Sequence, residues 1–144
     1  MIEKDTVKLL RECDAGVKMG ISSIEDVLGY VQNNKLEKLL TDCKNEHSKL
    51  DKQIGQMLER YQDDGKEPAL IAKGMSKIKT NVKLTMEESD ATIADLMTDG
   101  CNMGVKSLNR YLNQYEGADE ASKDIAKRLI HLEEQLAIDI REFL

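Results

Sequence analysis

The sequence contains no tryptophan, one proline and one phenylalanine among its 144 residues, together with four tyrosines. With so few aromatic rings, a folded core has to be built from aliphatic side chains, and the seven methionines can fill the gaps between them. Hydrophobic residues make up 40% of the chain and charged residues 33%, which is typical of a globular protein rather than a disordered one. We therefore expect a single domain over residues 1–144, large enough to bury a sizeable core.

Long apolar runs, an excess of basic charge and paired cysteines are also absent. No apolar run approaches the roughly 20 residues that a membrane-spanning helix needs, and the N-terminal residues lack the pattern of a signal peptide. The net charge of −6 argues against a general nucleic-acid binder. The cysteines at 13, 43 and 101 are odd in number and lack Cys-x-x-Cys spacing, as expected for reduced thiols. We expect a cytoplasmic protein that binds neither nucleic acid nor a membrane.

Apolar residues recur with spacings of three and four along most of the chain, which indicates amphipathic helices, and no stretch alternates like a strand. This pattern predicts four long helices over about 4–31, 35–62, 86–115 and 119–143. The second is expected to bury Leu36, Leu40, Cys43, His47, Leu50, Ile54, Met57 and Tyr61. The fourth is expected to bury Ala121, Ile125, Leu129, Leu132, Leu136, Ile140 and Phe143.

The connection between the second and third helices is long. Asn34 is expected to cap the second helix, and Thr85 opens another capping box that breaks the chain before the third. A single helix over 67–116 would be about 75 Å long, whereas the second helix spans only about 40 Å. The apolar spacing within residues 68–82 therefore predicts a shorter amphipathic crossover helix that begins at Pro68 and lies along the bundle. Such a crossover makes the second and third helices parallel.

Two stretches of the chain resemble each other. Residues 103–112 match residues 19–28 at four of ten positions, at a constant offset of 84 (103 − 19). They fall in the later parts of the first and third helices, as expected for an internally duplicated pair of helical hairpins. This layout resembles the ferritin-like four-helix bundle. The resemblance implies an all-α fold with two antiparallel hairpins joined by a helical crossover.

Metal-binding members of that superfamily use a Glu from each of two helices and Glu-x-x-His from each of the other two. The two histidines of this chain, His47 and His131, are also 84 positions apart (131 − 47). The residues three positions before them are Lys44 and Arg128, whose charge would repel a metal ion. His131 is also expected on the solvated face of its helix. The di-metal motif is therefore incomplete, and we expect no bound metal and no cofactor.

His47 differs from His131 because it lies within an apolar stripe. The favoured interpretation is a buried polar layer in which His47 is hydrogen-bonded to a carboxylate or to a backbone carbonyl. The alternative is an altered site for iron or another transition metal, which would draw on the inward acidic residues of the other helices. Its candidate ligands are Glu12, Asp14, His47, Asp95 and Glu133.

Nothing in the sequence pairs a nucleophile with a base, and Cys43 and Cys101 fall on apolar stripes as small hydrophobic residues. We therefore favour a non-catalytic structural or interaction protein on a ferritin-like scaffold that lacks the usual di-metal site. Its partner would be another protein or further copies of the same chain. The alternative is a metal-binding or redox protein of ferritin-like descent with an unusual carboxylate and histidine ligand set.

Overall fold

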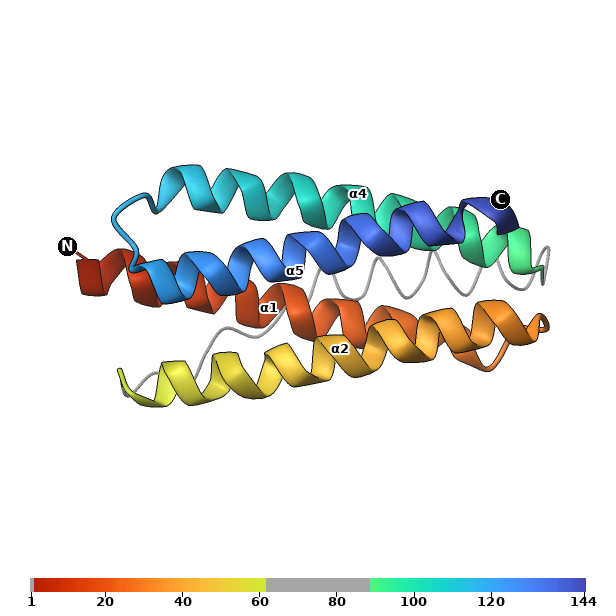
Figure 1. Ribbon diagram of the computed structural model, residues 1–144, viewed down its shortest axis with the longest axis horizontal. Helices are drawn as coiled ribbons and strands as arrows, with labels where there is room; N and C mark the ends of the chain where they lie inside the picture. The colour runs from red at the N-terminus through yellow and green to blue at the C-terminus, as the bar shows by residue number, and fades with distance from the viewer. Residues whose placement is uncertain (1, 62–88) are drawn as a thin grey trace.

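The computed structural model describes residues 2–61 and 89–144, and within these ranges it contains helices and no strands. The elements are α1 (Ile2–Leu28), α2 (Asn34–Glu59), α4 (Asp90–Gln114), α5 (Glu120–Asp139) and the short 3-10 helix η1 (Ile140–Phe143). The four α-helices lie lengthwise against one another (Figure 1). The predicted all-α four-helix bundle is confirmed.

The helices form two antiparallel hairpins, α1 with α2 and α4 with α5 (Figure 1). Helices α2 and α4 run in the same direction, so that the end of α2 and the start of α4 lie at opposite ends of the bundle. The side chain of Asp90, the first residue of α4, accepts hydrogen bonds from the backbone N–H groups of Gln32 and Asn33, at 2.9 and 3.0 Å. The parallel direction of these two helices is as predicted. The predicted crossover helix over 68–82 and the capping box at Thr85 lie outside the described residues.

Polar side chains fix the starts of three helices. Asn33, Ser89 and Asp119 have extended backbones, and the side chain of each accepts a hydrogen bond from a backbone N–H two or three residues further on. Helix α2 is therefore capped one residue earlier than the expected Asn34. Helix α4 begins at Asp90 rather than near 86, because the backbone of Ser89 (φ −130°, ψ 153°) departs from helical geometry.

The core is aliphatic, and it consists of two clusters, one in each half of the bundle. One is built around residues such as Leu10, Ile54 and Leu129. The other contains residues such as Leu40 and Leu136. Fully buried aliphatic side chains of this size are each worth about 1.5–3 kcal/mol relative to exposure. The two clusters are separated, on every helix, by a gap of about one to two turns.

Most of the expected inward positions are correct. The six predicted residues of α2 from Leu36 to Ile54 are all buried. His131 is exposed, as expected. Ala121 is exposed, and its neighbour Ser122 is fully buried instead; four other expected positions are half-buried, namely Met57, Tyr61, Leu132 and Phe143. The inward face of α5 therefore begins at Ser122, one residue later than the apolar pattern suggested. The pattern missed this position because its side chain is polar.

Candidate functional site

A polar layer to which all four helices contribute lies between the two aliphatic clusters, and its two cysteines also pack in the second cluster. We define this central polar layer as Gly20 on α1, Cys43 and His47 on α2, Cys101 and Gly104 on α4, and Glu133 on α5. Its polar side chains are shielded from solvent: 1% of the His47 side chain and 12% of the Glu133 side chain are exposed. The layer lies midway along the bundle, where solvent cannot compete for its hydrogen bonds.

Both nitrogens of the His47 ring face hydrogen-bond acceptors. Nδ1 lies 2.8 Å from the backbone oxygen of Cys43, and Nε2 lies 3.1 Å from Oε1 of Glu133. A carbonyl oxygen can only accept, so Nδ1 carries a proton and donates it. The contact between Nε2 and the carboxyl group needs a second proton on one of the two partners. The pair therefore holds one proton more than a neutral ring beside an ionised carboxylate.

The surroundings of His47 favour the charged ring. Burial lowers the pKa of His47, but the hydrogen bonds and charges of Cys43 and Glu133 outweigh burial and raise this pKa to about 10. At neutral pH the ring is thus an imidazolium paired with the Glu133 carboxylate. Burial, the charge of Glu133 and a hydrogen bond to that carboxylate raise the pKa of Cys101. The Cys101 thiol therefore stays protonated and donates to Glu133.

Two glycines allow the helices to approach this pair. A Cβ at Gly20 would lie 2.9 Å from Nε2 and from Cδ2 of His47, closer than ordinary packing permits. A Cβ at Gly104 would lie 3.4 Å from the carboxylate of Glu133. The two glycines are 84 positions apart (104 − 20) and belong to the two matching sequence stretches. The repeated Met-Gly dipeptide thus places one glycine against each half of the pair.

The structure brings together two of the five residues proposed as metal ligands, His47 and Glu133. Asp14 is buried, and it forms an ion pair with Lys18. Glu12 and Asp95 are half-buried on α1 and α4. Over residues 2–61 and 89–144, no group of three or more His, Cys, Asp and Glu side chains is arranged to hold a metal ion.

The expected hydrogen bonding of His47 is confirmed, since it contacts both a carboxylate and a backbone carbonyl. Sequence reasoning treated Cys43 and Cys101 as hydrophobic residues and missed their contacts with this pair. The signal for Cys43 was its position four residues before His47, on the same helix face.

The two hairpins repeat the same pattern of inward positions. Positions in α1 and α4 correspond at an offset of 84, as in Gly20 and Gly104 (104 − 20), whereas positions in α2 and α5 correspond at 86. Leu36, Leu40, Cys43, His47, Leu50 and Ile54 thereby match Ser122, Ala126, Leu129, Glu133, Leu136 and Ile140. The counterpart of His47 is thus Glu133 (133 − 47), and the exposed His131 has no part in the layer.

The ends of the bundle follow the same correspondence. The N-cap residues Asn33 and Asp119 are 86 positions apart (119 − 33). The backbone N–H of Asn33 donates to Asp90, and that of Asp119 donates to Oγ1 of Thr6, at 3.0 and 2.8 Å. Thr6 and Asp90 are 84 positions apart (90 − 6). Each hairpin therefore contacts the turn of the other hairpin through a residue near the start of its own first helix.

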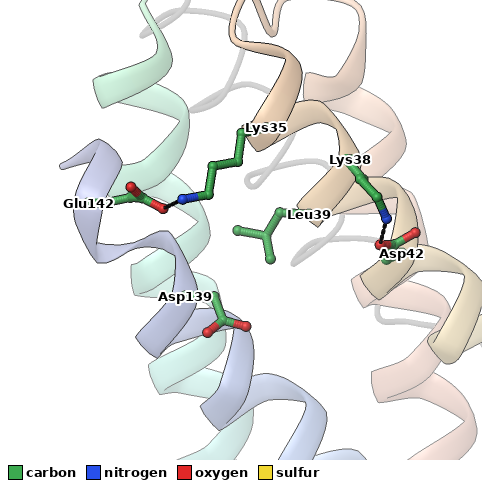
Figure 2. A pocket seen from close by; sticks show the side chains of 6 residues that line it. All are labelled: Lys35, Lys38, Leu39, Asp42, Asp139 and Glu142. Carbon is green, nitrogen blue, oxygen red and sulfur yellow. Dashed lines mark hydrogen bonds and ion pairs between the residues drawn. The ribbon is translucent and has the colours of Figure 1, made fainter.

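A shallow depression of about 320 Å³ lies on the surface where α2 meets the end of α5 and η1 (Figure 2). Four of its five charged residues form ion pairs, Lys35 with Glu142 at 2.6 Å and Lys38 with Asp42 at 2.8 Å, and the fifth, Asp139, accepts a hydrogen bond from the side chain of Gln135. The side chain of Leu39 lies between these two pairs (Figure 2). Two lysines and three acidic residues line the depression, so it carries one surplus negative charge, and both lysines are already paired.

No protein-family model matches this chain, and no curated protein or solved structure matches it either. None of the helices in the described ranges is long and apolar enough to cross a membrane. The function therefore has to be inferred from the central polar layer and the surface.

Proposed function

We propose that this protein is a non-catalytic structural or interaction protein on a ferritin-like scaffold that lacks the usual di-metal site. The observation that carries the proposal is the way His47 and Glu133 use their polar atoms. Both ring nitrogens bond to groups of the chain itself, and the carboxylate receives Nε2 of His47 and the Cys101 thiol. The pair serves the fold, because no donor or acceptor of the ring is left for a substrate.

The chemistry of the thiols supports a non-catalytic role. Burial, together with the charges of Glu12 and Asp14, raises the pKa of Cys13 to about 12. Cys13 and Cys101 are both buried and have raised pKa values, whereas a reactive cysteine needs an accessible thiolate. All three cysteines are free thiols, in keeping with the proposed cytoplasmic location.

The ferritin-like layout and an internal duplication are part of the proposal. Two antiparallel hairpins with α2 parallel to α4 give the order of helix directions that the resemblance implies (Figure 1). The duplication is supported by the offsets of 84 between Gly20 and Gly104 and of 86 between His47 and Glu133. It is also supported by the matching contacts that hold the two turns.

The partner is proposed to be a protein, including further copies of this chain. Among the described residues, four large apolar side chains are exposed: Tyr30, Met103, Ile138 and Leu144. Met103 is the most exposed of them, at 68%, and lies on the outer face of α4 beside Gly104. Apolar side chains of this kind contribute to protein contacts, whereas the net charge of −6 disfavours nucleic acid.

Elemental analysis tests the proposal directly. Protein purified without chelators or a histidine tag is expected to contain far less than one equivalent of iron, manganese or zinc per chain. One or two equivalents, lost in a His47→Gln variant, would contradict the proposal. Such a result would favour the alternative, a metal-binding or redox protein, whose support is that an imidazole and a carboxylate meet in the central polar layer. His131→Gln is the matched control, because His131 is exposed.

A further inference from the structure

We infer that the His47–Glu133 pair selects which hairpins associate, so that the α1–α2 hairpin binds the α4–α5 hairpin of its own chain rather than a second copy of itself. The inference rests on the internal duplication proposed above. His47 and Glu133 occupy corresponding positions of α2 and α5, 86 residues apart (133 − 47), yet they differ in charge. They bond to each other at the seam between the two hairpins.

The rest of the seam is mostly apolar on both sides: Leu50 and Ile54 of α2 have like counterparts in Leu136 and Ile140, whereas Leu36, Leu40 and Cys43 correspond to residues of other size, Ser122, Ala126 and Leu129. The corresponding inward positions of α2 and α5 are mostly aliphatic, and both α1 and α4 place a glycine against the pair. The turns are held by equivalent contacts from Thr6 and Asp90. Apolar contacts are not directional, so they disfavour the packing of a hairpin on a copy of itself only through these differences in side-chain size. Specificity therefore needs a feature that differs between the hairpins.

Pairing of like hairpins would bring like groups together. The α1–α2 hairpin on its own copy would place one His47 ring opposite another without a carboxylate, and two α4–α5 hairpins would place one Glu133 carboxyl group opposite another. Two like groups that stay charged repel strongly, because the surroundings screen them little, and two that become neutral lose the ionic hydrogen bond of the observed pair. The observed pair joins opposite charges at 3.1 Å and shares one hydrogen bond. The same two positions thus favour the intrachain partner and disfavour the wrong one.

No other described ionic group faces this pair with comparable burial. From α2 the ring meets Cys43, from α4 the carboxylate meets Cys101, and α1 contributes Gly20. The charged residues on the neighbouring turns of α2 pair with residues of α1, within the same hairpin: Lys44 with Glu25, and Asp51 with Lys18. The ion pair of Lys35 and Glu142 does join the two hairpins, but both side chains are more than half exposed. Exposed pairs of this kind discriminate weakly.

Reversal of the pair in the full-length chain tests the inference. His47→Glu and Glu133→His each create a like pair, and each is expected to lower the folding equilibrium constant by about a hundredfold or more. The double variant restores opposite charges. Its folding equilibrium constant is expected to be at least about tenfold higher than that of the less stable single variant. Denaturant unfolding in chelator-containing buffer at pH 6 measures all three. A double variant no more stable than that single variant would overturn the inference.

A neutral pair gives a second and independent measurement. His47→Gln combined with Glu133→Gln keeps hydrogen-bonding groups but removes the charge difference between the hairpins. After refolding from denaturant, this variant is expected to contain dimers that the unaltered chain does not form. Light scattering detects them, because the unaltered chain regains a single native mass. Refolding to the same single mass as the unaltered chain would overturn the inference.

Lys35→Gln with Glu142→Gln is the matched control for both measurements, because it neutralises an exposed ion pair across the same seam. It is expected to leave stability and refolded mass unchanged. These results are separate from the test of the proposed function: metal content decides whether the protein is a metalloprotein, and the chelated buffer keeps metal out of the pairing experiment.

Discussion

Gly20 lies against the ring of His47, so that a Cβ at position 20 would come within 2.9 Å of Nε2. A contact this short leaves no room for a methyl group unless the ring moves. The ring is held at both nitrogens, by the backbone oxygen of Cys43 and by Glu133. The absence of a side chain at position 20 is therefore a condition for the hydrogen bond that joins the two hairpins.

Gly20→Ala is expected to destabilise the protein by about 1–3 kcal/mol, because the displaced ring loses a buried charged hydrogen bond. The intrinsic gain from replacing a helical glycine by alanine, about 1 kcal/mol, opposes this loss. Gly16→Ala is the matched control, since its Cβ would meet Leu129 at an ordinary 3.8 Å, and it should be neutral or stabilising. Urea unfolding of the two variants measures the difference. Equal stability of the two would show that the ring yields without cost.

The sequence predicted the helices and much of the core because the apolar spacing of a bundle is a local pattern. All six expected residues of α2 between Leu36 and Ile54 are buried. Helix starts were less accurate, since several polar residues compete to cap each helix. Asn33 caps α2 in place of the expected Asn34, and only backbone geometry distinguishes such neighbours.

The polar layer could be predicted only in part. The apolar stripe showed that His47 faces inward, but its partner depends on how the two hairpins fit together. Glu133 lies 86 positions from His47 (133 − 47), whereas the visible sequence repeat has an offset of 84 and draws attention to His131. The two turns have the same length, but α4 ends at Gln114, two residues beyond the counterpart of Leu28 at position 112 (28 + 84), and this difference shifts the correspondence between α2 and α5. Long-range pairing of this kind is not encoded in local spacing.

The thiols provide a test of how tightly the core is closed. Cys13 and Cys101 are 0% and 3% exposed. A pKa of about 12 for Cys13 lowers its thiolate fraction about 1,000-fold at pH 8, relative to a cysteine with the ordinary pKa of 9.0. Alkylation of Cys13 by iodoacetamide in the native protein is expected to be slower by at least that factor than in urea. Mass spectrometry of peptides follows the reaction. Rapid native labelling of Cys13 would contradict the burial described for this helix.

The contacts at the two ends of the bundle should contribute alike to stability. Asp90→Ala removes the acceptor for two backbone N–H groups in the connection between α1 and α2. Thr6→Val removes the acceptor for the backbone N–H of Asp119. Each is expected to cost about 1–2 kcal/mol, as for the loss of a helix cap. Asp99→Ala, at an exposed position of α4, serves as control and should change stability by less than about 0.5 kcal/mol. Thermal unfolding measures all three, and a neutral Asp90→Ala would show that this end contact is dispensable.

The raised pKa of His47 makes stability depend on pH in a defined direction. The pKa is about 10 in the folded state and 6.5 for an ordinary histidine, so the folded state holds a proton that the unfolded chain releases. This contribution is fully present below pH 6.5 and is lost as the pH rises toward 10. Over this range the free energy of unfolding is expected to fall by up to about 1.4 kcal/mol per pH unit. Urea unfolding at several pH values between 6 and 8.5 measures the slope.

The upper limit of pH 8.5 separates His47 from the cysteines. The pKa of Cys13 is raised from 9.0 to about 12, so its thiol lowers stability only as the pH passes about 9. Glu133→Gln is the control, because a neutral amide can donate to Nε2 of an uncharged ring and removes the carboxylate that favours the cation. Its slope between pH 6.5 and 8.5 is expected to be much smaller than that of the unaltered protein. Equal slopes in the two proteins would place the titrating group elsewhere, since His47 can hold its extra proton at pH 8 only while Glu133 carries a negative charge beside it.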